Sequence, residues 1–409
     1  MNFSSLRYAL RGLSAYRTLL DDENESILDY ATTVLYTLAN GQKEQDEEER
    51  AEWGENALSA YACLFQALCD GGFSGIGDWL WDKLRYTETP FALSAQSDGA
   101  SPALEQAARR DVDALLALAG LDCGAILTAI AALLPPEQTS MVEAMPRWVS
   151  SAPFDFDRLV QFYRDHGAGL YARYRAFLWE DGQLIPVADP DCPKPEDLLG
   201  YEQQRSQVET NTRQMMAGHY ANNVLLFGDG GTGKSATVKS MLYLPGMEDL
   251  RLIEIQKENL TGLPQLMRSL RDKRQKFILF IDDLAFDQDD KTYSSMKTIL
   301  EKRPANVVIY ATSNRRHLVR QNFSDRGNDE VDASETIAEK TALAERFGLR
   351  IPYLSMSKAD FLALVDYLAG QAGLTLPAQE LHARAMTWEI RHSGRTPRVA
   401  RQFIASLLG

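Results

Sequence analysis

The sequence predicts an α/β fold in its second half, preceded by a mostly helical first half. Between residues 211 and 355, apolar β-rich runs alternate with helical stretches. This alternation is typical of a parallel sheet covered by helices on both faces. Residues 1–188 instead repeat apolar residues at helical spacing, for example in Phe156–Phe177, and predict an all-α domain.

The order of these patterns predicts four parts. They are an acidic, mostly helical N-terminal domain (1–188), a linker (189–210), an α/β core (211–355) and a helical lid (356–409). Residues 1–199 hold 15 basic and 32 acidic residues, a net charge of −17, within a chain of net charge −14. An acidic surface repels phosphates and argues against nucleic-acid binding by this half, although a well-solvated helical surface explains the same count.

Neither a membrane span nor a disulfide framework is expected. Ala114–Leu134 is the most apolar stretch, but Asp122 interrupts it, and two short buried helices with a break near Gly120–Cys123 explain it better. Asn2–Leu20 lacks the continuous apolar core of a signal peptide. No C-x-x-C pair joins the four cysteines, so we expect free thiols in a reducing cytoplasm (Cys63, Cys69, Cys123 and Cys192).

The five expected strands are Asn223–Phe227, Leu250–Ile255, Phe277–Ile281, Val307–Tyr310 and Leu349–Leu354. The first strand runs into the pattern G-x-x-x-x-G-K-S at Gly228–Ser235, which is followed by a helix. Glycines allow backbone N–H groups to face a phosphate, Lys234 can reach the β- and γ-phosphates, and the Ser235 hydroxyl suits Mg²⁺. We therefore expect ATP to be bound by Gly228, Asp229, Gly230, Gly231, Thr232, Gly233, Lys234, Ser235 and Ala236.

Polar side chains end two further strands. Phe277–Asp283 (FILFIDD) places Asp282 and Asp283 at the carboxyl edge of the sheet, beside the glycine loop. Asp282 is placed to bind Mg²⁺, directly or through water, and Asp283 to orient or deprotonate the attacking water. The alternative is a solvated acidic turn that continues with Asp287, Asp289 and Asp290.

Asn306–Asn314 (NVVIYATSN) ends the next strand along the chain. The Asn314 amide can hydrogen-bond both a γ-phosphate and the lytic water without adding charge. Asparagine after a strand is otherwise a common turn residue.

Five segments occur in the order of the motifs of the AAA+ ATPases, which the chain resembles over roughly residues 198–409. It is more narrowly similar to an uncharacterised bacterial AAA-type ATP-binding family, a domain of unknown function. The boxes around Arg346 and Arg398 are also similar to those of the Holliday-junction branch-migration motor. The five segments are Gly228–Ser235, Ile281–Asp283, Ala311–Asn314, Glu345–Gly348 and Gly394–Arg401.

The resemblance implies a five-stranded parallel sheet of order 5-1-4-3-2 with a C-terminal helical lid. It implies that Arg346 is an arginine finger reaching the γ-phosphate of a neighbouring subunit in a homo-oligomer, and that Arg398 senses γ-phosphate in the same chain. Arg346 could instead pair with Glu345 or Glu339. Arg398 could be a solvated cation, with Arg395 and Arg401 competing for its role. Tyr201 would lie where AAA+ linkers meet adenine, and simple linker packing is the alternative.

Three functions follow from these residues. The first is an ATPase whose oligomer acts on a protein client bound by the N-terminal domain. The second is a nucleotide-gated switch with little hydrolysis, because position 283 is Asp where most AAA+ motors carry Glu. The third is a DNA-acting motor or helicase loader, for which salt-sensitive DNA binding is expected. Arg315, Arg316 and His317 are candidate contacts, although a subunit interface or a helix start explains them equally well.

Overall fold

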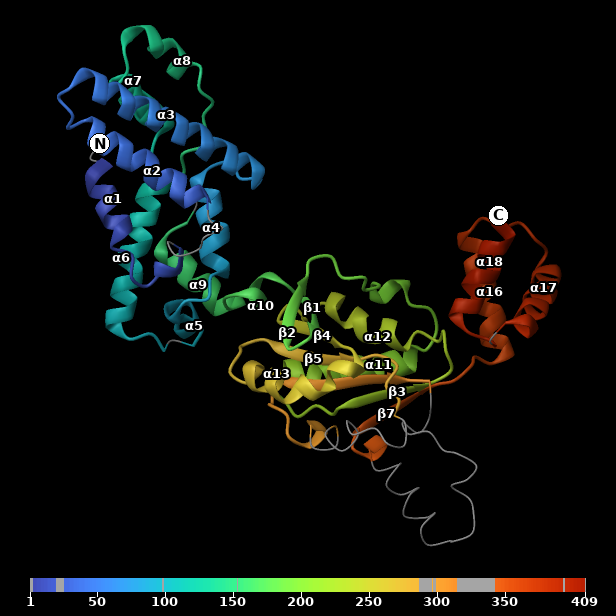
Figure 1. Ribbon diagram of the computed structural model, residues 1–409. Helices are drawn as coiled ribbons and strands as arrows, with labels where there is room; N and C mark the ends of the chain where they lie inside the picture. Colours follow the sequence, from blue (N-terminus) through green and yellow to red (C-terminus); the bar gives the residue numbers. More distant parts are fainter. Residues whose placement is uncertain are drawn as a thin grey trace. The chain divides into compact units, whose positions relative to one another are not determined.

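The computed structural model describes residues 3–19, 26–97, 99–152, 154–286, 296, 299–314, 343–392 and 394–408. The chain divides into two compact units, Met1–Arg173 and Tyr174–Gly409 (Figure 1). The second unit carries every residue expected to bind nucleotide.

The regular secondary structure in the described residues of the first unit consists of helices. Asp and Thr side chains cap several of its helices; for example, the Asp46 carboxylate accepts the N–H groups of Glu48 and Glu49 at the start of α3. The helices are α1 (Phe3–Arg11), η1 (Arg17–Leu19), α2 (Ser26–Gly41), α3 (Glu47–Asp70), α4 (Ile76–Tyr86), α5 (Pro90–Ala95), α6 (Pro102–Ala119), α7 (Cys123–Ala131), η2 (Pro136–Gln138), α8 (Thr139–Glu143), α9 (Phe156–His166) and α10 (Leu170–Arg173).

The predicted break in the apolar stretch near residue 120 is confirmed. Helix α6 ends at Ala119 and α7 begins at Cys123, where the Asp122 side chain accepts the Ala125 N–H as an N-cap. Among the described residues no single helix is long and apolar enough to cross a membrane, while α6 and α7, bent by 67°, meet that length and composition as a pair. Both helices contribute to the core of the first unit through Val112, Leu115, Ile126 and Ile130.

The second unit is built on a seven-stranded sheet of order β2-β1-β4-β5-β6-β3-β7. Every strand pair is parallel except β1–β2. The five strands β7, β3, β6, β5 and β4 have the predicted order 5-1-4-3-2, so this prediction is confirmed. The strands are β1 (Ala176–Glu180), β2 (Gln183–Val187), β3 (Val224–Gly228), β4 (Leu250–Ile255), β5 (Lys276–Ile281), β6 (Val307–Ser313) and β7 (Leu349–Tyr353).

Strands β1 and β2 correct two predictions. The helix expected over Phe156–Phe177 ends before Ala176, and the all-α domain expected to reach residue 188 ends at Arg173. Asp181 and Gly182 have φ of 47° and 78° and form the tight turn of an antiparallel hairpin. An Asp-Gly turn of this kind matches the twist of the flanking strands, so residues 176–187 extend the sheet through the β1–β4 pair.

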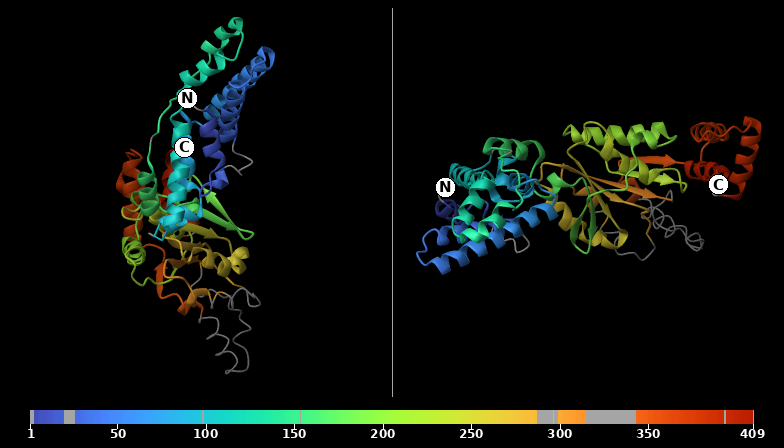
Figure 2. Two further views of the ribbon diagram at one scale, coloured as in Figure 1. Left: turned by 90° about the vertical axis from the view of Figure 1, so that its left-hand side faces the viewer. Right: turned by 90° about the horizontal axis from the view of Figure 1, so that it is seen from above.

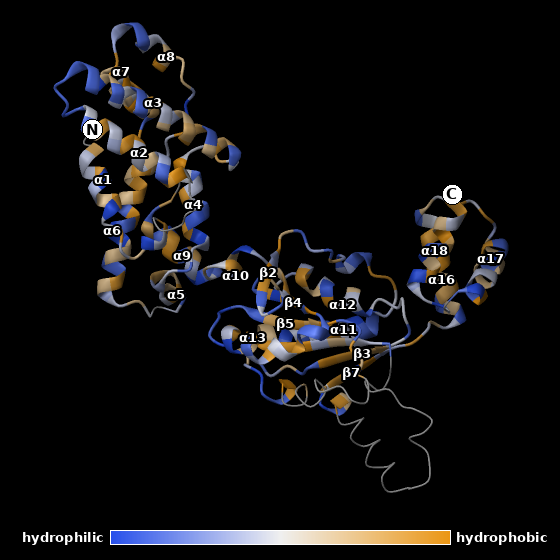
Figure 3. Ribbon diagram, viewed as in Figure 1, coloured by the Kyte–Doolittle hydropathy of each residue, from blue (hydrophilic) through white to orange (hydrophobic). Residues whose placement is uncertain are grey.

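Helices lie on both sides of this sheet (Figure 2). Side chains of α11 (Glu202–Met216), α12 (Lys234–Ser240) and η4 (Met241–Tyr243) pack on alternate residues of the strands, including Leu226, Ile278 and Tyr310. Helix α13 (Leu263–Leu270) follows β4 and η5 (Lys257–Gly262), and η3 (Pro195–Asp197) precedes α11. Strands β3 and β5, in the middle of the sheet, are largely apolar (Figure 3), as expected when both faces are covered.

The lid consists of three helices, as the sequence predicts from Lys358 onward. They are α16 (Lys358–Gln371), α17 (Ala378–Arg391) and α18 (Pro397–Leu408). The lid has its own core around Phe361, Val365 and Phe403. The hinge that follows β7 is tied to the lid because the Met356 N–H donates to the Arg395 carbonyl at 2.8 Å.

Candidate functional site

The glycine-rich loop lies between β3 and α12 and needs glycine for its shape. Gly228, Gly231 and Gly233 have φ of 132°, 78° and 93°, which side chains rarely tolerate. A Cβ atom at Gly228 would lie 2.2 Å from the Tyr353 carbonyl oxygen of the adjacent strand β7. Loops of this kind turn backbone N–H groups toward a common point, where an anion can bind.

The Lys234 side chain lies over this loop, and the residue is 7% exposed. Its Nζ donates to the carbonyl oxygens of Gly228 at 3.0 Å and Asp229 at 2.7 Å, and to Asn314 Oδ1 at 3.0 Å. Burial lowers the Lys234 pKa, and the nearby carboxylates of Asp229 and Asp282 oppose that shift. An incoming anion would therefore meet a cation that is already held in place.

Ser235 and Asp282 converge beside Lys234. The Ser235 hydroxyl donates to Asp282 Oδ1 at 2.6 Å. Thr312 Oγ1 and the Asp283 N–H (3.2 Å) also contact Oδ1, so the hydrogen bonds found for Asp282 in the described structure end on one carboxylate oxygen. A hydroxyl and a carboxylate fit Mg²⁺, which is commonly bound by one or two protein ligands plus phosphates and water. The described residues hold no cluster of three or more His, Cys, Asp or Glu suited to a metal.

Asn314 bridges the second acidic residue and the lysine. Its Nδ2 donates to Asp283 Oδ1 at 3.0 Å while its Oδ1 accepts from Lys234. The two partners fix the orientation of the amide, because its oxygen must face the ammonium and its nitrogen the carboxylate. The side chains of Lys234, Ser235, Asp282, Asp283 and Asn314 thus form one connected group at the carboxyl ends of β3, β5 and β6.

A cavity of about 290 Å³ adjoins the glycine loop. Gly231, Thr232 and Ala236 line it from the loop side, and Arg398 and Tyr201 line it from the lid and the linker. The Arg398 N–H donates to the Gly231 carbonyl at 3.3 Å, which places the start of α18 over the loop.

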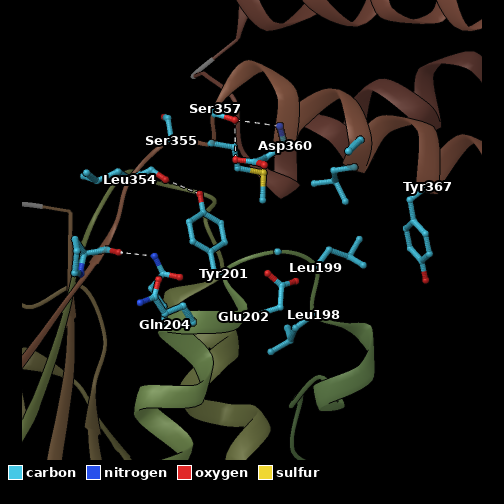
Figure 4. Close-up of a pocket in the computed structure, with 16 residues that line it drawn as sticks. Leu198, Leu199, Tyr201, Glu202, Gln204, Leu354, Ser355, Ser357, Asp360 and Tyr367 are labelled. Carbon is cyan, nitrogen blue, oxygen red and sulfur yellow. Dashed lines mark hydrogen bonds between the residues drawn. The ribbon is translucent and has the colours of Figure 1, made fainter.

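The Tyr201 ring is held in place by two contacts. It stacks on Tyr353 with ring centroids 5.0 Å apart and an angle of 24° between the planes. Its hydroxyl donates to the Leu354 carbonyl at 2.6 Å, and burial raises the Tyr201 pKa to about 12. Figure 4 shows this hydroxyl contact in a neighbouring cavity of about 720 Å³ that Tyr201 also lines. These contacts agree with the alternative that Tyr201 packs the linker against the core. A contact between Tyr201 and adenine stays a prediction.

The three arginines near the start of α18 differ in their surroundings. Arg398 and Arg401 line the smaller cavity, and Arg401 Nη2 also donates to the Asp197 carbonyl at 2.6 Å. Arg395 lies 3.9 Å from the Glu389 carboxylate. Arg398 therefore combines a place in the cavity with direct backbone contact to the glycine loop, which favours it for the sensor role.

Arg346 lies apart from this group. Its Nη1 donates to Glu301 Oε1 at 2.6 Å, and its side chain is 34% exposed. The intramolecular partner is thus Glu301, and not Glu345, while Glu339 lies outside the described residues. Arg315, Arg316 and His317, the candidate nucleic-acid contacts, and the acidic residues Asp287, Asp289 and Asp290 also lie outside them.

Sequence reasoning missed one contact of the glycine loop. Asp229 Oδ2 accepts both the N–H and the hydroxyl of Ser355, each at 2.7 Å, while the Asp229 N–H donates to the Tyr353 carbonyl at 2.9 Å. Ser355 lies in the hinge between β7 and the lid. Asp229 therefore connects the loop to the hinge.

We expect Asp229→Ala to release the Ser355 N–H. Without its acceptor, this amide should exchange with solvent about fivefold faster, because a hydrogen bond of this kind contributes about 1 kcal/mol. Residue-resolved hydrogen exchange measures this directly. The Met356 N–H, bonded to Arg395, serves as the internal control, and Asp229→Asn, which keeps an oxygen, should retain most of the protection. Equal Ser355 exchange in the parent and in Asp229→Ala would contradict the contact.

Comparison with known proteins identifies the family. The model of a family described as "Protein of unknown function (DUF815)" matches residues 172–409. No curated protein matches the chain.

Solved structures of RuvB from Thermotoga maritima are similar to part of the chain. One point variant has 13% sequence identity and a TM-score of 0.37, and the match covers 52% of this chain and 63% of the variant. The Holliday junction branch migration motor has 13% identity and a TM-score of 0.32, covering 52% and 72%. We therefore assign the fold from the strand order of this chain, β7-β3-β6-β5-β4 (5-1-4-3-2), and from the helical lid that follows β7.

The family match spans more than half of the chain, the whole sheet and the lid. It includes the glycine loop and the polar group that surrounds it. This chain is therefore a member of the DUF815 family.

Proposed function

We propose that the chain is an ATPase, converting ATP and water to ADP and phosphate. The observation that supports this most is the connected group of Lys234, Ser235, Asp282, Asp283 and Asn314 around a glycine loop. A cation, a hydroxyl–carboxylate pair and an amide–carboxylate pair are the side chains that phosphoryl transfer requires. A structural role alone gives no reason for three strands to end in polar groups that meet.

Each residue has a distinct part in this proposal. The loop N–H groups and Lys234 bind phosphate oxygens, and Ser235 and Asp282 hold Mg²⁺. The metal neutralises charge on the phosphates when it is bound. Asp283 and Asn314 orient the attacking water, and Asp283 accepts its proton. Arg398 donates to phosphate from the lid, and Tyr201 borders the base.

A second copy of the chain completes the site. Arg346 lies outside the group formed by its own chain, and we propose that it reaches the nucleotide of a neighbour in a homo-oligomer. Its partner Glu301 is 56% exposed, and an exposed pair of this kind contributes about 1 kcal/mol or less. Exchanging Glu301 for a phosphate would therefore cost little.

The first unit is proposed to bind a protein client. Its own sequence is acidic, with a net charge of −17 over residues 1–199. The change from bound ATP to bound ADP would move the lid. This movement would then transmit a force or a signal to the client. The four cysteines are free thiols, which suits a cytoplasmic location.

One contact favours a second candidate function, a nucleotide-gated switch with slow turnover. Asp283 is one methylene shorter than glutamate, and its carboxylate is engaged by the Asn314 amide. A shorter carboxylate that is hydrogen-bonded to Asn314 orients the attacking water less well. Small misplacements of a reacting group can lower the rate about 100-fold.

The Asp283→Asn variant separates binding from chemistry. We expect it to bind Mg-ATP like the parent and to lose turnover by about 10²–10⁴-fold, because the amide cannot accept a proton. Calorimetric titration and phosphate release measure the two properties. A clear gain in turnover for Asp283→Glu favours the switch, whereas unchanged turnover in Asp283→Asn contradicts the proposed role.

The same variant offers a route to the client. An ATP-bound Asp283→Asn chain should retain its partner in cell extract, and Lys234→Ala, which is expected not to bind ATP, is the control. A protein captured by the first and absent from the second would identify the client.

A further inference from the structure

Thr312 makes three hydrogen bonds to the turn that carries both acidic residues. It lies near the end of β6 and is 2% exposed. Its hydroxyl contacts Asp282 Oδ1 and lies 2.9 Å from the Asp283 nitrogen, and its carbonyl accepts the Leu284 N–H at 2.7 Å. Consecutive residues of this turn are thus bound to one residue of the neighbouring strand.

The chemistry of the groups fixes the direction of each bond. A backbone N–H can only donate, so the Thr312 oxygen accepts from Asp283. The one hydroxyl proton is then free to point at Asp282 Oδ1, which accepts it. A threonine or serine hydroxyl satisfies both partners at once, and an aliphatic side chain of the same shape satisfies neither.

The turn needs such support because of its backbone. Asp283 has φ of 49°, the left-handed region, which costs a non-glycine residue about 1–2 kcal/mol. This conformation brings the Asp283 carboxylate to the Asn314 amide at 3.0 Å. A strained residue persists where its surroundings hold it, and here the Thr312 hydroxyl and carbonyl bind the backbone on both sides of the strain.

We propose that Thr312 is a positioning residue for the catalytic pair Asp282 and Asp283. Its hydroxyl orients the Asp282 carboxylate, so that one oxygen takes the protein hydrogen bonds and the other remains for the cation. It also holds Asp283 in the strained turn that faces Asn314. This inference rests on the proposed ATPase function and adds to it the group that aligns the two carboxylates.

The Thr312→Val variant tests the proposal, because valine keeps the shape and removes the hydroxyl. Loss of a supporting contact around a metal ligand typically costs 10–100-fold in metal affinity or activity. We therefore expect Mn²⁺, titrated with ADP and followed by electron paramagnetic resonance, to bind about 10–100-fold more weakly. We expect kcat to fall by a similar factor while KM for ATP changes less than threefold.

Two variants separate positioning from ordinary packing. Thr312→Ser restores the hydroxyl and should bring Mn²⁺ affinity and kcat back to within about threefold of the parent. Thr212→Val removes another fully buried hydroxyl, which contacts Tyr310 at 2.8 Å and lies outside the polar group. It should lower thermal stability and leave the Mn²⁺ affinity unchanged. Should the valine variant not fold, Thr312→Cys, a poor hydrogen-bond partner, takes its place with the same expectation.

The outcomes distinguish the two proposals. If the parent binds and hydrolyses Mg-ATP and Thr312→Val matches it in Mn²⁺ affinity and kcat, the role of Thr312 is overturned and the ATPase stands. The role is also overturned if Thr312→Ser is as impaired as Thr312→Val. If the parent neither binds nor hydrolyses Mg-ATP, both proposals fall.

Discussion

Lys234→Ala should abolish detectable Mg-ATP binding, with affinity at least about 100-fold weaker than that of the parent. The variant loses the cation that the loop holds against Gly228 and Asp229, and charged hydrogen bonds to phosphate are among the strong ones. It also removes the partner that fixes Asn314. Calorimetric titration of the full chain with Mg-ATP gives the affinity.

A second lysine on the same helix provides the matched control. The Lys239 Nζ atom forms an ion pair with Glu254 of strand β4 at 2.8 Å. Lys239→Ala should change ATP affinity by less than about threefold, since it removes the same charge from a place without phosphate contact. If the two variants bind ATP equally well, Lys234 does not bind phosphate in the proposed way.

Arg346→Ala should lower kcat by about 10³–10⁵-fold and leave ATP binding nearly unchanged. This is the range measured for arginine fingers, which stabilise charge in the transition state. Steady-state phosphate release at saturating ATP measures the loss. Arg350→Ala, four residues later on the exposed edge strand β7, is the control and should keep its turnover.

Mixing two inactive variants tests whether the finger acts in trans. Lys234→Ala chains keep their finger, and Arg346→Ala chains keep their nucleotide site. In a mixed oligomer, the Arg346 of a Lys234→Ala chain can reach the intact nucleotide site of an Arg346→Ala chain. Part of the activity should therefore return. Without any recovery at concentrations where the variants co-assemble, Arg346 would act within its own chain or not at all.

The sheet could be predicted from the sequence because local signals determined it. Four of the five apolar runs were located within about one residue, with Leu250–Ile255 matching β4 at both ends, whereas Val307–Tyr310 ended three residues before β6 does. The loop Gly228–Ser235 was equally visible, because its four glycines lie within six consecutive residues of the chain.

The β1–β2 hairpin was missed although a signal was present. Asp181–Gly182 lies between two apolar runs, and Asp-Gly between such runs favours a hairpin. The helical spacing before it, which ends in α9 and α10, was extended too far. Attention to the turn residues would have moved the boundary to residue 174.

Contacts between distant residues could not be read from local patterns. Ser355 is 126 residues from Asp229, and Glu301 is 45 residues from Arg346. Thr312 lies in the stretch Asn306–Asn314, and no local pattern there indicates a role of its own. Its role emerges from the β5–β6 pairing, which places it beside the turn after Ile281.

The most direct test of the central claim is ATP turnover per chain as a function of protein concentration. The account predicts Mg²⁺-dependent phosphate release whose rate per chain rises with concentration, because each site needs the Arg346 of a second copy. The Lys234→Ala chain should show no such release at any concentration. A parent rate equal to that of Lys234→Ala would contradict the ATPase, and a measurable rate that stays constant while the chain remains monomeric would contradict the shared site.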